Sequence, residues 1–317
     1  MRPEPRADVL SLIVPVFNER ESLRPLFAEI DEATKPLGLM LEVWFIDDGS
    51  TDGSWETIRE LSADPRVHGL RFRRNFGKSA ALAAGFTRAT GATAMTLDAD
   101  LQDDPHEIPR FLAAIASGLD VVSGWKQIRH DPWHKVFPSR VFNRLVSAVT
   151  GVSLHDHNCG FKAYRAEVVR EVRLYGELHR FVPVLAAAEG FKVGELAIHH
   201  RSRKFGRSKF GARRFLKGFL DLLTVRLLTA FGHRPGHLFG TVALLLGGFG
   251  FLGVVLSLAL IVLVEGGLLA VVAEVIAFAV SFAMLLLGGV SFFAGLLAEF
   301  TLARSQPDEP YRIIETL

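Results

Sequence analysis

The chain has 317 residues, enough for one domain of ordinary size and an additional part. Its formal net charge is +2, so no strong overall charge suggests nucleic acid as a partner. The single cysteine, Cys159, excludes an internal disulfide, which fits a reducing compartment. The apolar run near the N-terminus is short and interrupted, which argues against a signal peptide.

The first half of the sequence alternates between apolar runs and helical patterns. Residues 9–17 form a β-branched apolar run, and the next segment places apolar residues at helical spacing. The scheme repeats from the runs at 41–46, 67–72 and 92–97. Strands that alternate with helices predict an α/β domain around a largely parallel sheet.

Polar clusters follow three of these predicted strands. They are Asn18–Glu19, residues 47–52 and residues 98–100. Ligands bind beyond the carboxyl ends of strands in such sheets, so we expect the clusters to share one edge. Asp47 lies at a strand end, where a carboxylate can accept hydrogen bonds from a base or a ribose. Residues 49–54 are equally typical of a turn, with Ser50 or Asp52 capping the next helix.

The stretch "FGKSAAL" resembles part of a phosphate-binding P-loop. The full motif needs a glycine where this chain has Phe72, so an ATPase is excluded. Gly77 and Lys78 remain at a predicted helix start, where backbone N–H groups and a lysine can hold an anion. A solvated surface charge is an equal interpretation of Lys78.

Four carboxylates are crowded into residues 98–104. If the chain stays extended, the side chains of Asp98 and Asp100 point the same way. With the amide oxygen of Gln102 they form a site for Mg²⁺ or Mn²⁺. Because Mg²⁺ usually keeps only one or two protein carboxylates, the motif predicts a metal shared with a diphosphate.

The other two aspartates of this stretch have plainer interpretations. Asp104 precedes Pro105 and a run of apolar residues at helical spacing, which predicts that Asp104 caps a helix. We expect Asp103 to be a solvated turn residue.

Two uncharged stretches, residues 238–264 and 275–298, each exceed the roughly 20 apolar residues that a membrane span needs. The short link between them predicts a helical hairpin. Lys and Arg flank the hairpin outside the link, so the positive-inside rule places both termini in the cytoplasm. The expected location is therefore the plasma (inner) membrane, with a multi-pass anchor.

A basic stretch precedes the hairpin. Residues 199–217 contain eight Lys or Arg and no acid. They can touch anionic headgroups or capture the phosphate of a lipid at the membrane surface. The segment that follows is amphipathic and is expected to lie in the membrane interface. The predicted organisation is a cytoplasmic α/β domain at 1–211, an amphipathic segment at 212–237, two membrane helices within 238–300 and a tail at 301–317.

Five stretches in order carry a family resemblance: "IVPVFNE", "FIDDGSTDGS", "RNFGKSAALAAGF", "LDADLQDDP" and "HRSRKFGRSKFG". The chain resembles family 2 glycosyltransferases with the GT-A fold, which is Rossmann-like. Within that family it more closely resembles dolichol-phosphate mannose synthase and the bacterial polyprenyl-phosphate glycosyltransferases. The resemblance implies metal-dependent, inverting transfer of a sugar from a GDP- or UDP-linked donor to a polyprenyl phosphate, as in cell-wall or glycan biosynthesis.

The resemblance also implies site residues. The nucleotide and metal pocket would use Pro15, Val16, Phe17, Glu19, Asp47, Asp48, Lys78, Asp98, Ala99 and Asp100. The metal would be held by Asp98, Asp100 and Gln102. Catalysis would rest on Asp98, Asp100, Arg203 and Lys209. Contacts to phosphate or acceptor would come from Lys126, Asp156, Arg180, Arg201 and Ser208. Several relatives carry Arg at the position of Lys126, which lacks the bidentate fork of Arg.

Two other functions stay open. The acceptor can instead be a glycolipid or a polysaccharide, although the Q-x-x-R-W motif of processive synthases is absent. A non-catalytic nucleotide-sugar-binding membrane protein is disfavoured by the intact D-x-D motif. The sequence does not name the sugar, the nucleotide, the prenyl length or a homo-oligomeric state.

Overall fold

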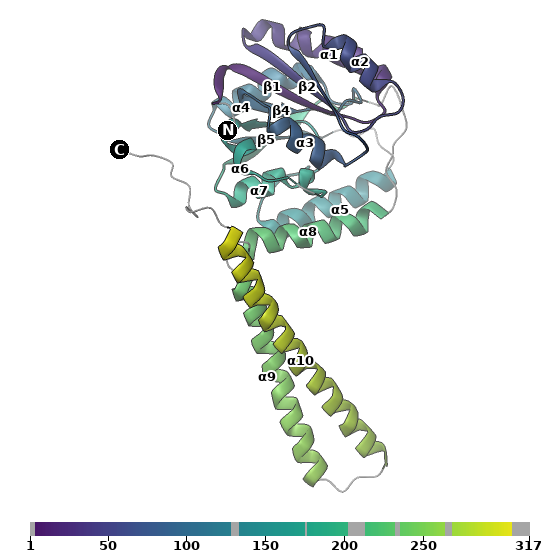
Figure 1. Ribbon diagram of the computed structural model, residues 1–317, viewed down its shortest axis with the longest axis vertical. Helices are drawn as coiled ribbons and strands as arrows, with labels where there is room; N and C mark the ends of the chain where they lie inside the picture. The colour runs from purple at the N-terminus through teal and green to yellow at the C-terminus, as the bar shows by residue number, and fades with distance from the viewer. Residues whose placement is uncertain are drawn as a thin grey trace, which may run out of the picture. The chain divides into compact units, whose positions relative to one another are not determined.

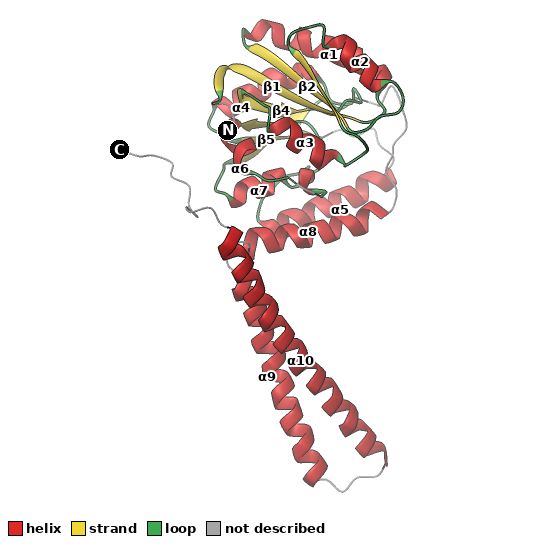
Figure 2. Ribbon diagram, viewed as in Figure 1, coloured by secondary structure: helices red, strands yellow, loops and turns green. Residues whose placement is uncertain are grey.

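The computed structural model describes residues 4–127, 133–174, 176–201, 213–231, 235–263 and 268–305. The chain divides into two compact units, Met1–Thr229 and Ala230–Leu317. The first unit contains a sheet between layers of helices, and the second contains two long apolar helices (Figures 1 and 2).

The first unit is built on a sheet with the strand order β3-β2-β1-β4-β6-β5-β7. Only β6 runs antiparallel to its neighbours β4 and β5, while the other neighbouring pairs are parallel. The predicted α/β fold with a largely parallel sheet is therefore confirmed. The strands are β1 Arg6–Val16, β2 Met40–Asp47, β3 Val67–Arg71, β4 Gly91–Thr96, β5 Val121–Lys126, β6 Lys162–Arg165 and β7 Val193–Ile198.

Helices cover both faces of this sheet because its strands bury side chains in both directions. Leu12 of β1 packs into a core with α1 (Arg20–Thr34), α2 (Ser54–Leu61) and α4 (Ile108–Ala116). Its neighbour Ile13 packs into the opposite core. That core is formed with α3 (Lys78–Phe86), α6 (Ala166–Glu171) and α7 (Val182–Ala188). Three short 3₁₀ turns complete the layers: η1 Lys35–Leu37, η2 Pro105–Glu107 and η3 Leu178–Arg180.

The helices α5 (Trp133–Thr150) and α8 (Arg213–Phe231) lie side by side below the sheet (Figure 1). Val146 of α5 and Leu222 and Val225 of α8 share a small buried core with residues from the η3–α7 region. The outer side of the pair stays apolar. Its exposed side chains are Phe137, Val141 and Leu145 on α5, and Phe219, Leu220, Leu223, Leu227 and Leu228 on α8.

The second unit consists of α9 (Pro235–Leu263) and α10 (Leu268–Ser305). Two stretches are long and apolar enough to cross a membrane, Pro235–Ile261 and Leu269–Thr301. The second helix begins earlier than the expected span at 275, because the sequence between Leu268 and Glu274 is itself helical. The two apolar helices lie against each other as an antiparallel pair, as Figure 1 shows.

Small residues allow this close packing. A Cβ atom at Gly288 of α10 would lie 2.7 Å from the backbone nitrogen of Gly247 on α9. A Cβ at Gly250 would lie 2.5 Å from the backbone nitrogen of Leu285. Backbone approach of this kind is how helices associate in lipid, where burial of apolar surface contributes little.

Candidate active site

The loops after β1 and β2 are joined by hydrogen bonds. Asn18 adopts a left-handed backbone conformation with φ of 55°. Its backbone N–H donates to Ser50 Oγ at 2.9 Å, and its side-chain oxygen accepts from the backbone N–H of Thr51 at 2.8 Å. The N–H of Glu19 donates to Ser54 Oγ at 3.0 Å. The serines and the threonine of "DDGSTDGS" therefore hold the "NE" loop in place at the sheet edge.

Turn hydrogen bonds and a close backbone approach shape the second loop. Asp52 accepts hydrogen bonds from the N–H of Ser54, the first residue of α2, and from the N–H of Arg20. Gly49 has a φ of 75°, and a Cβ there would lie 2.5 Å from the carbonyl carbon of Arg74. Turn chemistry thus shapes the loop, and the close approach of residue 74 explains why position 49 needs glycine.

The two aspartates at the end of β2 have internal hydrogen-bond partners. Asp47 is fully buried, and its Oδ1 accepts from the N–H of Ser50 at 2.9 Å. Asp48 accepts from the N–H groups of Phe76 and Gly77 at 2.6 and 2.9 Å. Burial raises the pKa of Asp48 above its ordinary value, although these hydrogen bonds oppose the shift. Asp48 thereby fixes the backbone directly before Lys78.

Lys78 begins α3, and its ammonium forms an ion pair with Asp98 Oδ1. Both side chains are about one-third exposed, with exposed fractions of 30% and 31%. A Cβ at Gly160 would lie 2.4 Å from Asp98 Oδ2, so glycine at 160 provides the space that this carboxylate occupies. Asp98 is therefore paired with a lysine from the start of a different element, the helix α3.

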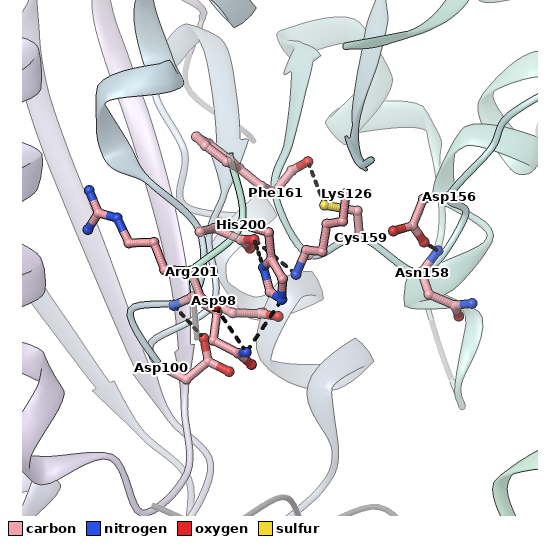
Figure 3. Close-up of polar contacts among 12 residues, drawn as sticks. Asp98, Asp100, Lys126, Asp156, Asn158, Cys159, Phe161, His200 and Arg201 are labelled. Atoms are coloured by element: carbon pink, nitrogen blue, oxygen red, sulfur yellow. Dashed lines mark hydrogen bonds and ion pairs between the residues drawn. The ribbon is translucent and has the colours of Figure 1, made fainter. Parts of the chain in front are cut away.

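The D-A-D motif lies in a turn, because β4 ends at Thr96. The chain is therefore not an extended strand at Asp98 and Asp100, so strand alternation does not set the directions of their side chains. Asp100 Oδ1 accepts from the N–H of Gln102 at 3.1 Å. The Gln102 amide lies 3.5 Å from His200 Nε2 and 3.5 Å from the carbonyl oxygen of Arg201 (Figure 3).

The expectation that Asp103 is a solvated turn residue is wrong. Its side chain is fully buried, and its Oδ1 lies 2.9 Å from the Nζ of Lys126 and 3.7 Å from His200 Nδ1. Burial alone would raise the pKa of Asp103, but Lys126 and His200 outweigh it and hold that pKa below its ordinary value. Sequence reasoning missed this residue because its partners end two strands that lie later in the chain.

Asp104 starts a helix, as the sequence predicts. Its carboxylate accepts from the N–H of His106, and Pro105 occupies the first position of the 3₁₀ turn that leads into α4. Its other oxygen lies 2.7 Å from Arg201 Nη2, and Arg201 also pairs with Glu29 at 2.6 Å. These two acids hold the side chain of Arg201, which follows β7, between α1 and the turn that leads into α4.

Two other predicted acceptor contacts are buried and have partners within the protein. Arg180 is 7% exposed and pairs with Glu177 at 3.0 Å and with Asp221 of α8 at 4.0 Å. Asp156 accepts from the N–H of Asn158 at 3.1 Å, and Figure 3 shows both residues. Arg203, Ser208 and Lys209 lie outside the described residues.

The remaining pocket residues surround the end of β1. Pro15 and Val16 close the strand, Phe17 and Glu19 follow it, and Ala99 lies between the two carboxylates of the D-A-D turn. The strand ends thus bring the predicted nucleotide and metal residues to one edge of the sheet.

The donor set at this edge fits a divalent metal. Asp98 and Asp100 supply carboxylate oxygens, which are the preferred ligands of Mg²⁺ and Mn²⁺. Gly160 leaves room around the Asp98 carboxylate, which a bound cation would share with Lys78. Among the described residues, no group of three or more His, Cys, Asp or Glu side chains is arranged to hold a metal alone.

Curated proteins with related sequences include two named sugar transferases or synthases. The chain is 38% identical over 249 residues to a dodecaprenyl-phosphate galacturonate synthase of Rhizobium johnstonii, covering 77% of this chain and 74% of that protein. It is 37% identical to an undecaprenyl-phosphate 4-deoxy-4-formamido-L-arabinose transferase of an Enterobacter species, covering 70% and 71% of the two chains.

Solved structures show the same fold at low sequence identity. A glucosyl-3-phosphoglycerate synthase from Mycobacterium tuberculosis, in complex with Mn²⁺, UDP and phosphoglyceric acid, matches with a TM-score of 0.54. It is 15% identical and covers 70% of this chain and 78% of its own. Residues 11–173 match the family described as Glycosyl transferase family 2. Together with the sequence relatives, this match shows that the chain belongs to glycosyl transferase family 2.

Proposed function

We propose that this protein transfers a sugar from a nucleoside diphosphate to a polyprenyl phosphate in the membrane. The observation that carries the proposal is the identity of 37–38% to transferases named for dodecaprenyl or undecaprenyl phosphate, over about three quarters of each chain. Two helices of membrane-spanning length support a lipid acceptor.

The donor would lie at the sheet edge formed by β1, β2 and β4. Asp47 lies at the end of β2 and is proposed to face the base or ribose, while Lys78 would meet the diphosphate at the start of α3. Asp98 and Asp100, with Gln102, would hold a divalent cation. When bound, such a cation supplies positive charge against the negative charge that grows on the leaving diphosphate.

The acceptor needs positioning more than activation. A phosphate monoester has a second pKa near ~6, so its oxygen is largely ionised at neutral pH. No general base is then required to remove a proton before that oxygen attacks the sugar carbon. Direct displacement would invert the anomeric centre. Among predicted phosphate contacts, Arg203, Ser208 and Lys209 belong to the basic stretch before α8 and remain proposals from sequence.

The exposed apolar side of α5 and α8 supports a location at the membrane surface. The α5 sequence contains no acidic residue, and the only acid of α8, Asp221, pairs with Arg180. Arg140, Arg144 and Arg226 are exposed on the same two helices. An apolar surface with flanking cations is suited to a bilayer with anionic headgroups. We infer that the domain faces the cytoplasm, because Lys and Arg flank the apolar helices outside their link.

A product assay tests the proposal. The purified full-length protein in detergent receives Mn²⁺ or Mg²⁺, undecaprenyl phosphate and, in separate reactions, a series of UDP- and GDP-sugars. We expect a glycosylated lipid phosphate with at least one donor. Product that forms only with a glycolipid or polysaccharide acceptor would contradict the proposed acceptor, and nucleotide-sugar binding without any transfer would contradict an enzyme.

A further inference from the structure

The buried side chain of Asp103 joins three separate segments at the sheet edge. Asp103 follows the D-A-D turn, Lys126 is the last residue of β5, and His200 lies two residues beyond the end of β7. Its carboxylate lies 2.9 Å from the Lys126 ammonium. His200 is 5% exposed, and its ring lies 3.7 Å from the same oxygen. No step of the proposed transfer uses any of these three groups.

The turn beside this cluster has a costly backbone conformation. Leu101 has a φ of 61° although it is not glycine, and its side chain is buried. A bulky residue in the left-handed region is rare, and such strain persists only where surrounding contacts hold the backbone. The contacts that hold the backbone of Leu101 are therefore expected close to it, between the proposed metal ligands and α4.

Three contacts next to Leu101 involve residues at or just beyond the ends of β7 and β5. The N–H of Arg201 donates to the carbonyl oxygen of Gln102 at 2.8 Å. Asp103 and His200 form an isolated antiparallel bridge through their backbones. The Asp103–Lys126 ion pair then ties the same residue to β5. Backbone and side-chain contacts thus fix the two residues that follow the strained position.

We propose that Asp103 is a positioning residue which, through Lys126 and His200, fixes the turn that presents Asp98 and Asp100. Lys126 then acts through Asp103 and is not a ligand of donor or acceptor phosphate. The inference rests on the proposed function in one respect: it assumes that the turn binds a divalent cation together with a nucleoside diphosphate.

A double-mutant cycle separates this role from phosphate binding. The variants are Asp103→Asn, Lys126→Met and the two combined, all in the full-length protein. The probe is Mn²⁺ binding in the presence of UDP or of GDP, measured from the electron paramagnetic resonance signal of free Mn²⁺. We expect each single variant to weaken Mn²⁺ binding by about 10- to 100-fold, the usual effect of losing a partner outside the ligand set.

The double variant distinguishes a shared positioning role of Asp103 and Lys126 from two independent roles. If both residues act through one cluster, the double variant loses no more affinity than the single variants, and the two effects are not additive. It also leaves no unpaired buried charge, so it stays folded even where a single variant does not. Lys126→Arg retains the charge and is expected to restore most of the binding. The KM for polyprenyl phosphate should stay unchanged in every variant.

Asp120→Asn is the matched control. Asp120 pairs with Arg165 at 3.2 Å directly before β5, at the end of the strand opposite to Lys126. Its loss should lower the melting temperature without changing Mn²⁺ binding. Additive losses, a raised acceptor KM in Lys126→Met with intact Mn²⁺ binding, or unchanged binding in Asp103→Asn would each overturn the proposal. Failure of sugar transfer alone would not, because Mn²⁺ binding is measured independently.

Discussion

The aspartates of residues 98–104 have separate partners. Asp98 pairs with Lys78, Asp103 with Lys126, and Asp104 with Arg201. Asp100 accepts a hydrogen bond from the backbone of Gln102. Like charges can therefore be crowded in sequence because each carboxylate is offset locally, and only Asp98 and Asp100 remain as proposed ligands of a divalent cation.

The buried imidazole of His157 makes the free energy of unfolding depend on pH. His157 is fully buried, and its Nε2 lies 3.0 Å from Ser147 Oγ. Burial, with Lys162 nearby, lowers the pKa of His157 from 6.5 to about 4. Between these values the unfolded chain binds more protons than the folded protein, so stability falls as the pH is lowered.

We expect the free energy of unfolding to decrease by up to about 1.4 kcal/mol per pH unit on this account as pH falls from 6.5 towards 4. The stability is fully present above pH 6.5. Thermal unfolding of the wild type and of His157→Gln at pH 7 and pH 5 measures the effect. Gln can still contact Ser147 but does not titrate, so the variant should lose less stability; an equal loss in both proteins would rule out His157 as the source.

At the scale of elements, α5 and α8 combine a buried side with an exposed apolar side. The buried side packs beneath η3 and α7, and Gly218 of α8 lies close to Phe142 of α5. An exposed apolar side is what an interfacial role of residues 212–237 requires, and that role stays a prediction. The sequence of α5 does not predict such a side, because Pro138 and several polar residues interrupt its apolar pattern.

Replacing apolar side chains on this surface should weaken use of a membrane-embedded acceptor. We expect Phe137→Ser combined with Leu223→Ser to raise the KM for undecaprenyl phosphate in vesicles severalfold, since two exposed side chains no longer enter the interface. A short-chain, water-soluble prenyl phosphate should be used as before. Leu39→Ser removes an exposed leucine elsewhere and is the control; equal effects of all variants would contradict a membrane-facing role.

The packing of α9 against α10 gives a test with adjacent glycines. A methyl group at Gly288 would meet the α9 backbone, whereas nothing lies within 4 Å of a Cβ at Gly289. Gly288→Ala should therefore destabilise the helix pair by about 1–3 kcal/mol, the usual cost of overpacking, and Gly289→Ala should not. Resistance of the full-length protein to unfolding by sodium dodecyl sulfate measures this, and similar curves for the two variants would contradict the packing.

At the scale of the whole molecule, the features that can be predicted from the sequence are those that depend on local residue patterns. The strand ends, the helix cap at Asp104 and the two apolar helices follow from periodicity and from turn chemistry at particular residues. The partners of Asp103 could not be predicted. Lys126 and His200 lie far from it in the sequence, and only the order of the strands in the sheet brings them close to it. The same limit applies to the pair of Lys78, which begins α3, and Asp98, which follows β4.

The most direct test is the mass of the lipid product formed by the full-length protein. With the donor sugar that supports transfer, divalent metal and undecaprenyl phosphate, we predict a lipid phosphate heavier by one sugar residue. Asp100→Asn should lower its rate of formation by about a hundredfold or more, because the charge on the leaving diphosphate is less well stabilised. Absence of this product with every nucleotide sugar, or an unchanged rate in Asp100→Asn, would contradict the account.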